Sequence, residues 1–176
     1  MTKSIVLGGG CFWCTEAVFS ELDGVKSSQP GYSGGSIQNP SYEMVCEGNT
    51  GHAEVAKVEY DPDVISLPEL LDVFFSMHDP TSLNRQGGDI GEQYRSVIFY
   101  ESEEDAAMIR RAVAEVQSSY SKPIITAIEP LKNFYPAEEY HKNYFRKNPN
   151  AGYCRAVIGP KVEKIKHTYG AIIVKR

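Results

Sequence analysis

The chain has 176 residues, a length that suits one domain, and 41% of them are hydrophobic, which is enough for a core without disulfide staples. Its net charge of -5 argues against general nucleic-acid binding, which requires a basic face, and no run approaches the ~20 apolar residues that a membrane helix needs. The N-terminal residues do not resemble a signal peptide, so we expect a cytoplasmic protein whose four cysteines serve chemistry rather than structural bridges.

The first half of the chain alternates strand-like and helix-like segments. A short apolar run predicts a buried strand at 3–7, and the glycines after it lead into a predicted helix at 12–22. Residues 29–51 are rich in Gly, Pro, Ser, Asn and Tyr and predict a long, functional loop. Alternation predicts a strand at 55–60, and Pro68 in a first turn favours a helix at 67–77.

The second half continues the alternation. It predicts, in order, an irregular stretch at 78–93, a strand at 94–100, a helix at 102–120, a strand at 124–128, a helix at 137–146 and a loop-rich end at 148–176 with strand-like runs at 156–158 and 171–174. We therefore expect residues 1–176 to form a single catalytic domain of the α+β class, with helices over one mixed sheet and long functional loops.

The strongest chemical signal is the string Gly8-Gly9-Gly10-Cys11-Phe12-Trp13-Cys14. A glycine turn that runs from a strand into a helix start places Cys11 beside free backbone N–H groups and the positive end of the helix dipole. Both effects stabilise a thiolate, so we predict an acidic, nucleophilic thiol at Cys11. The glycines, Gly10 among them, leave room for a substrate to approach the sulfur.

Cys14 permits several interpretations. With Cys11 it has the spacing of half a zinc site, but no second pair of ligands follows. The pair also has the spacing of a redox-active dithiol. Alternatively, Cys14 is a small buried residue on the apolar stripe of its helix.

Two further segments contribute candidate polar groups. Gly51-His52-Ala53-Glu54 leads into a predicted strand, where a carboxyl desolvated by a pocket would have a raised pKa and act as a proton donor. The glycine-rich stretch from Gly87 to Tyr94 has no Gly-Lys-Ser/Thr sequence and so does not match a phosphate loop. It is better interpreted as a pocket wall that presents the Tyr94 hydroxyl.

The fourth segment, Asn148 to Cys154, consists of turn-forming residues before a cysteine. Cys154 is either a buried thiol at the start of a strand or a mobile resolving cysteine. In the second interpretation, the flexible run carries its sulfur to Cys11.

Together these segments resemble the peptide methionine sulfoxide reductase A family, over most of the chain from Gly8 to about Cys154. Gly-Cys-Phe-Trp is the most specific motif, and Pro40-Ser41-Tyr42, Gly-His-Ala-Glu and Gln-Tyr-Arg-Ser follow it in the family's order. The resemblance implies a two-layer α/β sandwich with a ferredoxin-like sheet. It implies reduction of the S epimer of methionine sulfoxide, peptide-bound or free, without a metal or bound cofactor.

The resemblance also implies residue roles. Cys11 matches the nucleophile, Glu54 the acid, and Tyr42 and Tyr94 its hydroxyl partners. The matched substrate-binding residues are Phe12 and Trp13, which hold the methyl group, and Asp89. Cys154 matches a recycling cysteine, whereas many relatives have glycine at the position of Cys14.

This chemistry joins a soft nucleophile on the sulfoxide sulfur to a proton on its oxygen. Cys11 becomes a sulfenic acid, which condenses with a thiol to a disulfide. We expect that thiol to be Cys154, with Cys14 and Cys46 as alternatives. By resemblance, thioredoxin then reduces the disulfide, and we expect a monomer without a nucleic-acid or membrane partner.

Two other functions remain possible from the sequence. A hydrolase would pair Cys11 with His52 or His141 and would need no external thiol. A metal-binding module would use Cys11 and Cys14 as ligands.

Overall fold

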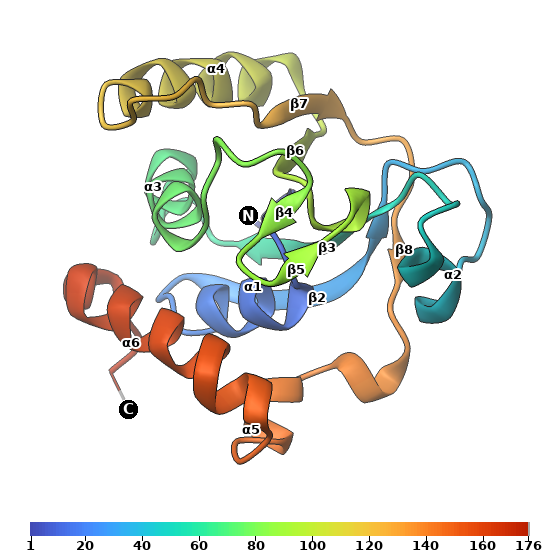
Figure 1. The fold of residues 1–176 in the computed structure, drawn as a ribbon. Helices are drawn as coiled ribbons and strands as arrows, with labels where there is room; N and C mark the ends of the chain where they lie inside the picture. The colour runs from blue at the N-terminus through green and yellow to red at the C-terminus, as the bar shows by residue number, and fades with distance from the viewer. Residues whose placement is uncertain (176) are drawn as a thin grey trace.

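The computed structural model describes residues 1–175, with one sheet at the centre and helices packed against it (Figure 1). The strands are β1 (Lys3–Gly8), β2 (Val25–Ser33), β3 (Ala53–Tyr60), β4 (Arg85–Gln86), β5 (Asp89–Ile90), β6 (Val97–Tyr100), β7 (Ala127–Pro130) and β8 (Tyr135–Pro136). The α-helices are α1 (Phe12–Phe19), α2 (Tyr42–Glu47), α3 (Leu67–Met77), α4 (Glu103–Gln117), α5 (Tyr144–Lys147) and α6 (Gly159–Thr168). The shorter helical turns are η1 (Glu92–Tyr94), η2 (Glu139–His141), η3 (Cys154–Ile158) and η4 (Gly170–Ile172).

The main sheet has six strands in the order β7-β6-β1-β3-β2-β8. Strands β6 and β7 are parallel, and the other neighbours are antiparallel. Strands β4 and β5 form a separate small hairpin. The expected α+β architecture with a mixed sheet is confirmed.

Each face of the sheet carries its own apolar cluster, as the alternation of strand residues requires. Ile5 and Leu7 on β1 face the main core, which holds Val18 of α1, Leu70 of α3 and Ile109 of α4. The opposite face forms a smaller second cluster, whose members are Val6, Ala53, Val55, Val97 and Phe99. Helices therefore cover the face with the main core. Within residues 1–175, no helix is both long enough and apolar enough to cross a membrane.

The prediction of a continuous loop at 29–51 was wrong in two places, at its N-terminal end and in its interior. Residues 25–33 form β2, although the strand is largely polar and contains Pro30 and Gly31, because it pairs along most of β3. Tertiary pairing outweighs the weak local strand propensity of such a sequence. Helix α2 interrupts the remaining loop, with Ser41 as its N-cap and Gly48 in the left-handed region at its end.

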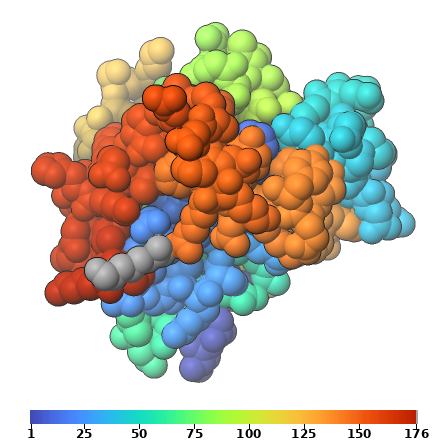
Figure 2. All heavy atoms as spheres, turned by 90° about the horizontal axis from the view of Figure 1, so that it is seen from below, coloured from blue at the N-terminus to red at the C-terminus, as the bar shows by residue number. Residues whose placement is uncertain are grey.

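The C-terminal prediction was also wrong. Residues 154–158 form a π-helical turn that continues into α6, rather than a strand in a loop-rich tail. Ile158, Val162 and Ile165 recur at helical spacing and are buried against the main core. In Figure 2 this orange-to-red segment covers much of one face, with blue N-terminal atoms visible between its parts.

Smaller differences concern the ends of elements. The predicted 137–146 helix is two short pieces, because Asn143 lies in the left-handed region with a φ of 54° between η2 and α5. Helix α1 ends at Phe19 and α4 at Gln117, short of the predicted bounds. Strand β6 begins at Val97, and β7 extends over Ala127–Pro130 rather than 124–128.

Helix α3 begins with a complete capping box. Ser66 Oγ accepts a hydrogen bond from the Glu69 amide at 3.3 Å, and Glu69 Oε2 accepts one from the Ser66 amide at 2.8 Å. Replacing Ser66 with alanine should therefore lower the free energy of unfolding by about 1 kcal/mol. Urea unfolding checks this value, with Ser119→Ala, at an exposed turn, as the matched control that should change stability by less than about 0.5 kcal/mol. Equal stability of the two variants would contradict the prediction.

Candidate active site

One end of the main sheet brings the separate sequence motifs together. Because β1 is antiparallel to both β3 and β6, the end of β1 lies beside the starts of its two neighbours. Cys11 follows the end of β1, Glu54 lies at the start of β3, and Tyr94 lies three residues before the start of β6. The topology thus places side chains from three distant segments around one point.

Cys11 occupies the N-cap position of α1, as the glycine string predicts. Its side chain makes no capping hydrogen bond, and 8% of the residue is exposed. Gly10 has a φ of 98°, a conformation that L side chains rarely adopt, and a Cβ there would lie 3.1 Å from the side chain of Gln86. The glycine therefore shapes the turn that presents the Cys11 thiol.

Burial opposes the acidic thiol that the glycine string predicts at Cys11. Burial raises the pKa of the Cys11 thiol well above its ordinary value, and Glu54 raises it further once its own carboxyl is ionised. The Phe12 N–H donates to Glu54 Oε1 at 3.2 Å, and the Trp13 N–H lowers the pKa of the Cys11 thiol by less than burial raises it. Desolvation and a neighbouring acid thus outweigh the helix terminus.

Glu54 is a buried carboxyl group beside that thiol, with 1% of the residue exposed. Burial raises its pKa to about 8, even though the hydrogen bond from the Phe12 amide opposes the change. Its second oxygen, Oε2, is buried and has no hydrogen-bond partner within residues 1–175. The site therefore holds a carboxyl that is largely protonated at pH 7, with one oxygen unengaged.

Tyr42 and Tyr94 both pack against the small apolar cluster that contains Cys11. Burial, followed by the charge of Glu54, raises the pKa of each phenol above its ordinary value, so both remain hydrogen-bond donors. Glu138 helps to fix the positions of Tyr32 and Tyr42. Its two oxygens accept hydrogen bonds from the Tyr32 hydroxyl at 2.9 Å and from the Tyr42 amide at 3.0 Å.

The two aromatic residues after Cys11 lie in different environments. Phe12 has no exposed surface and packs against Tyr32 and Tyr42, with ring centroids 5.6 Å and 6.3 Å away. Trp13 is only partly buried and stacks on Tyr144, with centroids 3.7 Å apart and planes 5° apart. Trp13 is therefore the ring of this pair that solvent reaches.

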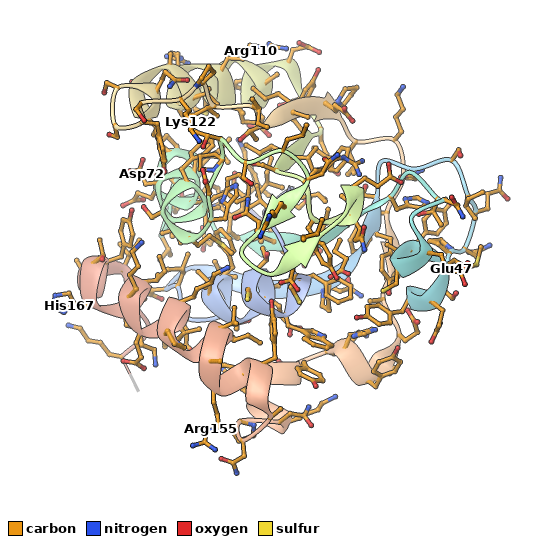
Figure 3. The ribbon with its side chains drawn as sticks, viewed as in Figure 1. Glu47, Asp72, Arg110, Lys122, Arg155 and His167 are labelled. Atoms are coloured by element: carbon orange, nitrogen blue, oxygen red, sulfur yellow. The ribbon has the colours of Figure 1, made fainter. Side chains whose placement is uncertain are left out.

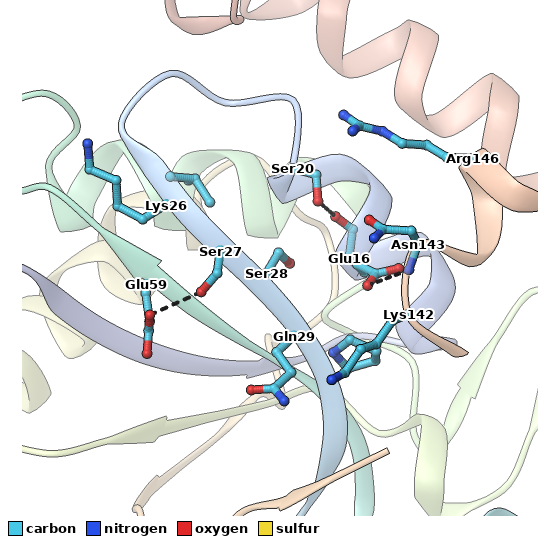
Figure 4. A pocket seen from close by; sticks show the side chains of 12 residues that line it. Glu16, Ser20, Lys26, Ser27, Ser28, Gln29, Glu59, Lys142, Asn143 and Arg146 are labelled. Atoms are coloured by element: carbon cyan, nitrogen blue, oxygen red, sulfur yellow. Dashed lines mark hydrogen bonds between the residues drawn. The ribbon is translucent and has the colours of Figure 1, made fainter. Parts of the chain in front are cut away.

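Hydrogen bonds fix the orientation of Trp13 through the C-terminal segment. Its Nε1 donates to His141 Nδ1 at 3.0 Å, and His141 is fully buried. The same segment is held to α1 by Glu16, whose Oε2 accepts a hydrogen bond from the Asn143 amide at 3.0 Å. Figure 4 shows this contact in a separate polar hollow of about 500 Å³, which contains none of the predicted catalytic residues.

Tyr153 connects Asp89 and Cys154 to the site, since it bonds to Asp89, contacts Trp13 and directly precedes Cys154. The Tyr153 hydroxyl donates to Asp89 Oδ2 at 2.6 Å, and its ring makes an edge-on contact with Trp13, with centroids 5.9 Å apart. Cys154 itself is fully buried in the main core, at the start of η3. The expectation that a flexible loop carries this thiol was wrong, because the residue belongs to a packed helical segment.

The geometry does not favour the two other functions. His52 Nδ1 accepts a hydrogen bond from the Gly35 amide and Nε2 contacts the Ile37 carbonyl, while His141 Nδ1 is engaged by Trp13. Neither imidazole is bonded to Cys11 as a general base. Over residues 1–175, no cluster of three or more His, Cys, Asp or Glu side chains is arranged to hold a metal ion.

Several residues of the site were not identified from the sequence. Tyr144 and Tyr153 both contact Trp13, and Glu138 anchors Tyr42. Within the string Gly-Tyr-Cys, only Cys154 was predicted to belong to the site. Nothing local marks these positions, because their contacts join segments about 60 to 140 residues apart along the chain.

Comparisons with known proteins identify relatives of the whole chain. A family model described as "Peptide methionine sulfoxide reductase" matches residues 3–172. Peptide methionine sulfoxide reductase MsrA of Campylobacter jejuni is 57% identical over 164 residues, which cover 93% of this chain and 98% of that protein.

Two solved structures are also similar. Mxr1 from Saccharomyces cerevisiae in reduced form is 42% identical, with a TM-score of 0.81 over 87% of this chain and 89% of that one. Mxr1 in complex with Trx2 is 32% identical, with a TM-score of 0.57 over 81% and 84% of the two chains.

Proposed function

The chain belongs to the peptide methionine sulfoxide reductase family, and from this premise we propose how its residues divide the reduction of methionine sulfoxide. Cys11 attacks the sulfoxide sulfur and Glu54 protonates the oxygen. The observation that carries this assignment is the buried Glu54 carboxyl, whose Oε1 is bonded to the amide next to Cys11 while Oε2 is unengaged. A neutral acid with a free oxygen is the donor that a basic sulfoxide oxygen requires.

Contact with the substrate favours the ionised form of the buried Cys11 thiol. The sulfur of a sulfoxide carries partial positive charge, which favours a thiolate at Cys11 when the two sulfurs come into contact. Because Glu54 is neutral below about pH 8, it does not oppose that charge. Cys11 loses its proton as the Glu54 proton passes to the oxygen, and the thiol proton restores the acid.

The remaining site residues bind and orient the substrate. The hydroxyls of Tyr42 and Tyr94 donate to the sulfoxide oxygen. Trp13, with Phe12 of the adjoining apolar cluster, holds the methyl group, and Gly10 leaves the sulfur accessible. Asp89 acts through Tyr153, which it fixes against the Trp13 ring.

After oxygen transfer, methionine leaves and Cys11 is a sulfenic acid. Condensation with a thiol of the same chain releases water and forms a disulfide. We assign Cys154 as that thiol, so the product is a Cys11–Cys154 disulfide, and thioredoxin as the dithiol that reduces it. The Mxr1 complex with Trx2 supports this choice of reductant. Neither a metal nor a bound cofactor takes part in this scheme.

The proposal includes the setting of the enzyme. Its substrates are oxidised proteins or free methionine sulfoxide. Residues 1–176 act as one catalytic domain and as a monomer. All four cysteines are free thiols, which fits a reducing, cytoplasmic compartment.

The substrate assignment predicts stereospecific, thiol-dependent turnover. Peptides that contain the S epimer of methionine sulfoxide should be reduced with dithiothreitol or with thioredoxin, thioredoxin reductase and NADPH, and the R epimer should remain. Chiral chromatography of the products measures both rates, with enzyme lacking reductant as the control. Equal reduction of the two epimers, or turnover that continues without a thiol, would contradict the proposal.

A further inference from the structure

Glu16 is a buried acid to which the proposed reaction gives no role. It is the single charged residue in the sequence of helix α1, where it follows Trp13 by three positions, and only 4% of it is exposed. Charged side chains are almost never buried to this extent unless they are paired or hydrogen-bonded. The partners of Glu16 therefore indicate what it does.

Those partners are backbone amides of the C-terminal segment. Glu16 Oε2 accepts a hydrogen bond from the Asn143 amide at 3.0 Å (Figure 4). Burial raises the pKa of the Glu16 carboxyl, whereas hydrogen bonds from the amides of Asn143 and Tyr144 oppose that change. Glu16 thus joins helix α1 to the junction between η2 and α5.

Asn143 is the residue at which this junction bends. Its φ of 54° lies in the left-handed region, which residues other than glycine adopt less readily, so the bend depends on contacts that hold it. His141 ends η2 on one side of the bend, and Tyr144 begins α5 on the other. The hydrogen bond from Asn143 to Glu16 therefore fixes where these two residues lie relative to helix α1.

Both residues that flank the bend contact Trp13. The indole Nε1 of Trp13 donates to His141 Nδ1 at 3.0 Å, and the Trp13 ring stacks on Tyr144 with centroids 3.7 Å apart. The first contact sets the direction of the indole N–H, and the second sets the plane of the ring. The orientation of Trp13 consequently depends on the bend that Glu16 holds.

We propose that Glu16 is a positioning residue, which orients the Trp13 ring for the substrate methyl group through its hydrogen bond to the bend at Asn143. The inference rests on the proposed function, which assigns the methyl group to Trp13. Because Glu16 acts on a binding ring and not on the reacting atoms, its loss should weaken substrate binding and leave the acid, Glu54, in place. The half-saturating substrate concentration should rise, and the maximal rate of the first step should change little.

Fluorescence tests the orientation of the ring without any substrate. Trp13 is the single tryptophan of the sequence, so the emission of the reduced, full-length protein comes from this ring alone. Glu16→Ala removes the acceptor and Glu16→Asp withdraws it by one methylene. Both variants should shift the emission to longer wavelength and increase its quenching by acrylamide. Glu16→Gln keeps an oxygen that can accept from the Asn143 amide, and it should retain the wild-type emission.

Single-turnover kinetics with a methionine S-sulfoxide peptide test the consequence for binding. For Glu16→Ala and Glu16→Asp, the peptide concentration that half-saturates methionine release should rise about 5- to 10-fold, which is the usual contribution of an aromatic contact, while the maximal rate changes by less than about 3-fold. Glu16→Gln should stay within about 2-fold of the wild type in both quantities. All variants should keep the fall in rate that Glu54 gives near pH 8.

Asp72→Ala is the matched control, since it removes an exposed acid from helix α3 (Figure 3) and should change neither the emission nor the kinetics. Wild-type emission and half-saturation in Glu16→Asp would overturn the proposal, and this variant decides the question if Glu16→Ala does not fold. A Glu16→Gln variant as impaired as Glu16→Ala would also overturn it, because the retained hydrogen bond would then not orient the ring. If the wild type released no methionine, the proposed function would fail, whereas the emission would still test the orientation of Trp13.

Discussion

Replacing Cys11 with serine is expected to abolish reduction of methionine sulfoxide, with a fall in kcat of about 10⁴-fold or more. A serine hydroxyl is a poor nucleophile toward sulfur and cannot carry the oxidation to a disulfide. Cys11 is the N-cap of α1 and is buried near the Glu54 carboxyl. No other thiol of the chain lies at this position to replace it. Methionine release in a single-turnover assay measures the effect.

The control for the Cys11 variant is its fold. Serine is similar in size to cysteine, and the side chain makes no capping hydrogen bond that the change would remove. The circular dichroism spectrum and the cooperativity of urea unfolding should therefore match those of the wild type. A folded Cys11→Ser protein that still releases methionine would refute the assignment of the nucleophile.

Replacing Glu54 with glutamine should slow the first chemical step by about 10²- to 10⁴-fold, which is the usual contribution of a positioned proton donor. Glutamine retains an oxygen that can accept the hydrogen bond from the Phe12 amide, but its amide cannot release a proton at neutral pH. Rapid-quench measurement of methionine formation isolates this step from recycling. An unchanged rate would remove Glu54 from the chemistry.

The pH dependence of the same step gives an independent test. The acid acts in its neutral form, which is populated below a pKa of about 8, so the wild-type rate should fall as the pH rises through that value. The Glu54→Gln variant has no such group and should lose this fall. Were the variant to retain the same alkaline limb, another group would be the acid.

The pH dependence of the free energy of unfolding should also reveal the titration of Glu54. In the unfolded chain the Glu54 pKa returns to its ordinary value near 4.5, whereas in the folded protein it is about 8. Between these values the folded state binds more protons than the unfolded state, so this group makes stability decrease as the pH rises from about 4.5 to about 8. Glu54→Gln should remove that contribution, which urea midpoints across this pH range would show.

Much of the site was predictable from local sequence. The glycine string before Cys11 marks the strand-to-helix turn, and the order of the motifs indicates the family. The start of α3 was also predictable, because Pro68 lies in its first turn. These features depend on residues within a few positions of one another, where steric and hydrogen-bonding rules act directly.

Other features required the whole structure. Polar β2 becomes a strand only because β3 pairs with it, and the C-terminal residues form a helix because Ile158, Val162 and Ile165 reach the main core. The contacts of Trp13 with His141 and Tyr144 join segments about 130 residues apart along the chain. No local pattern indicates such partners.

The sequence by itself determined which atoms are available for chemistry: a cysteine at a helix start, a glutamate at a strand start and tyrosines in the intervening loops. Only the tertiary structure decided the surroundings of these groups, which bury both the Cys11 thiol and the Glu54 carboxyl. The reason is that desolvation depends on every group packed around a side chain. Those groups come from strands and helices that are far apart along the chain.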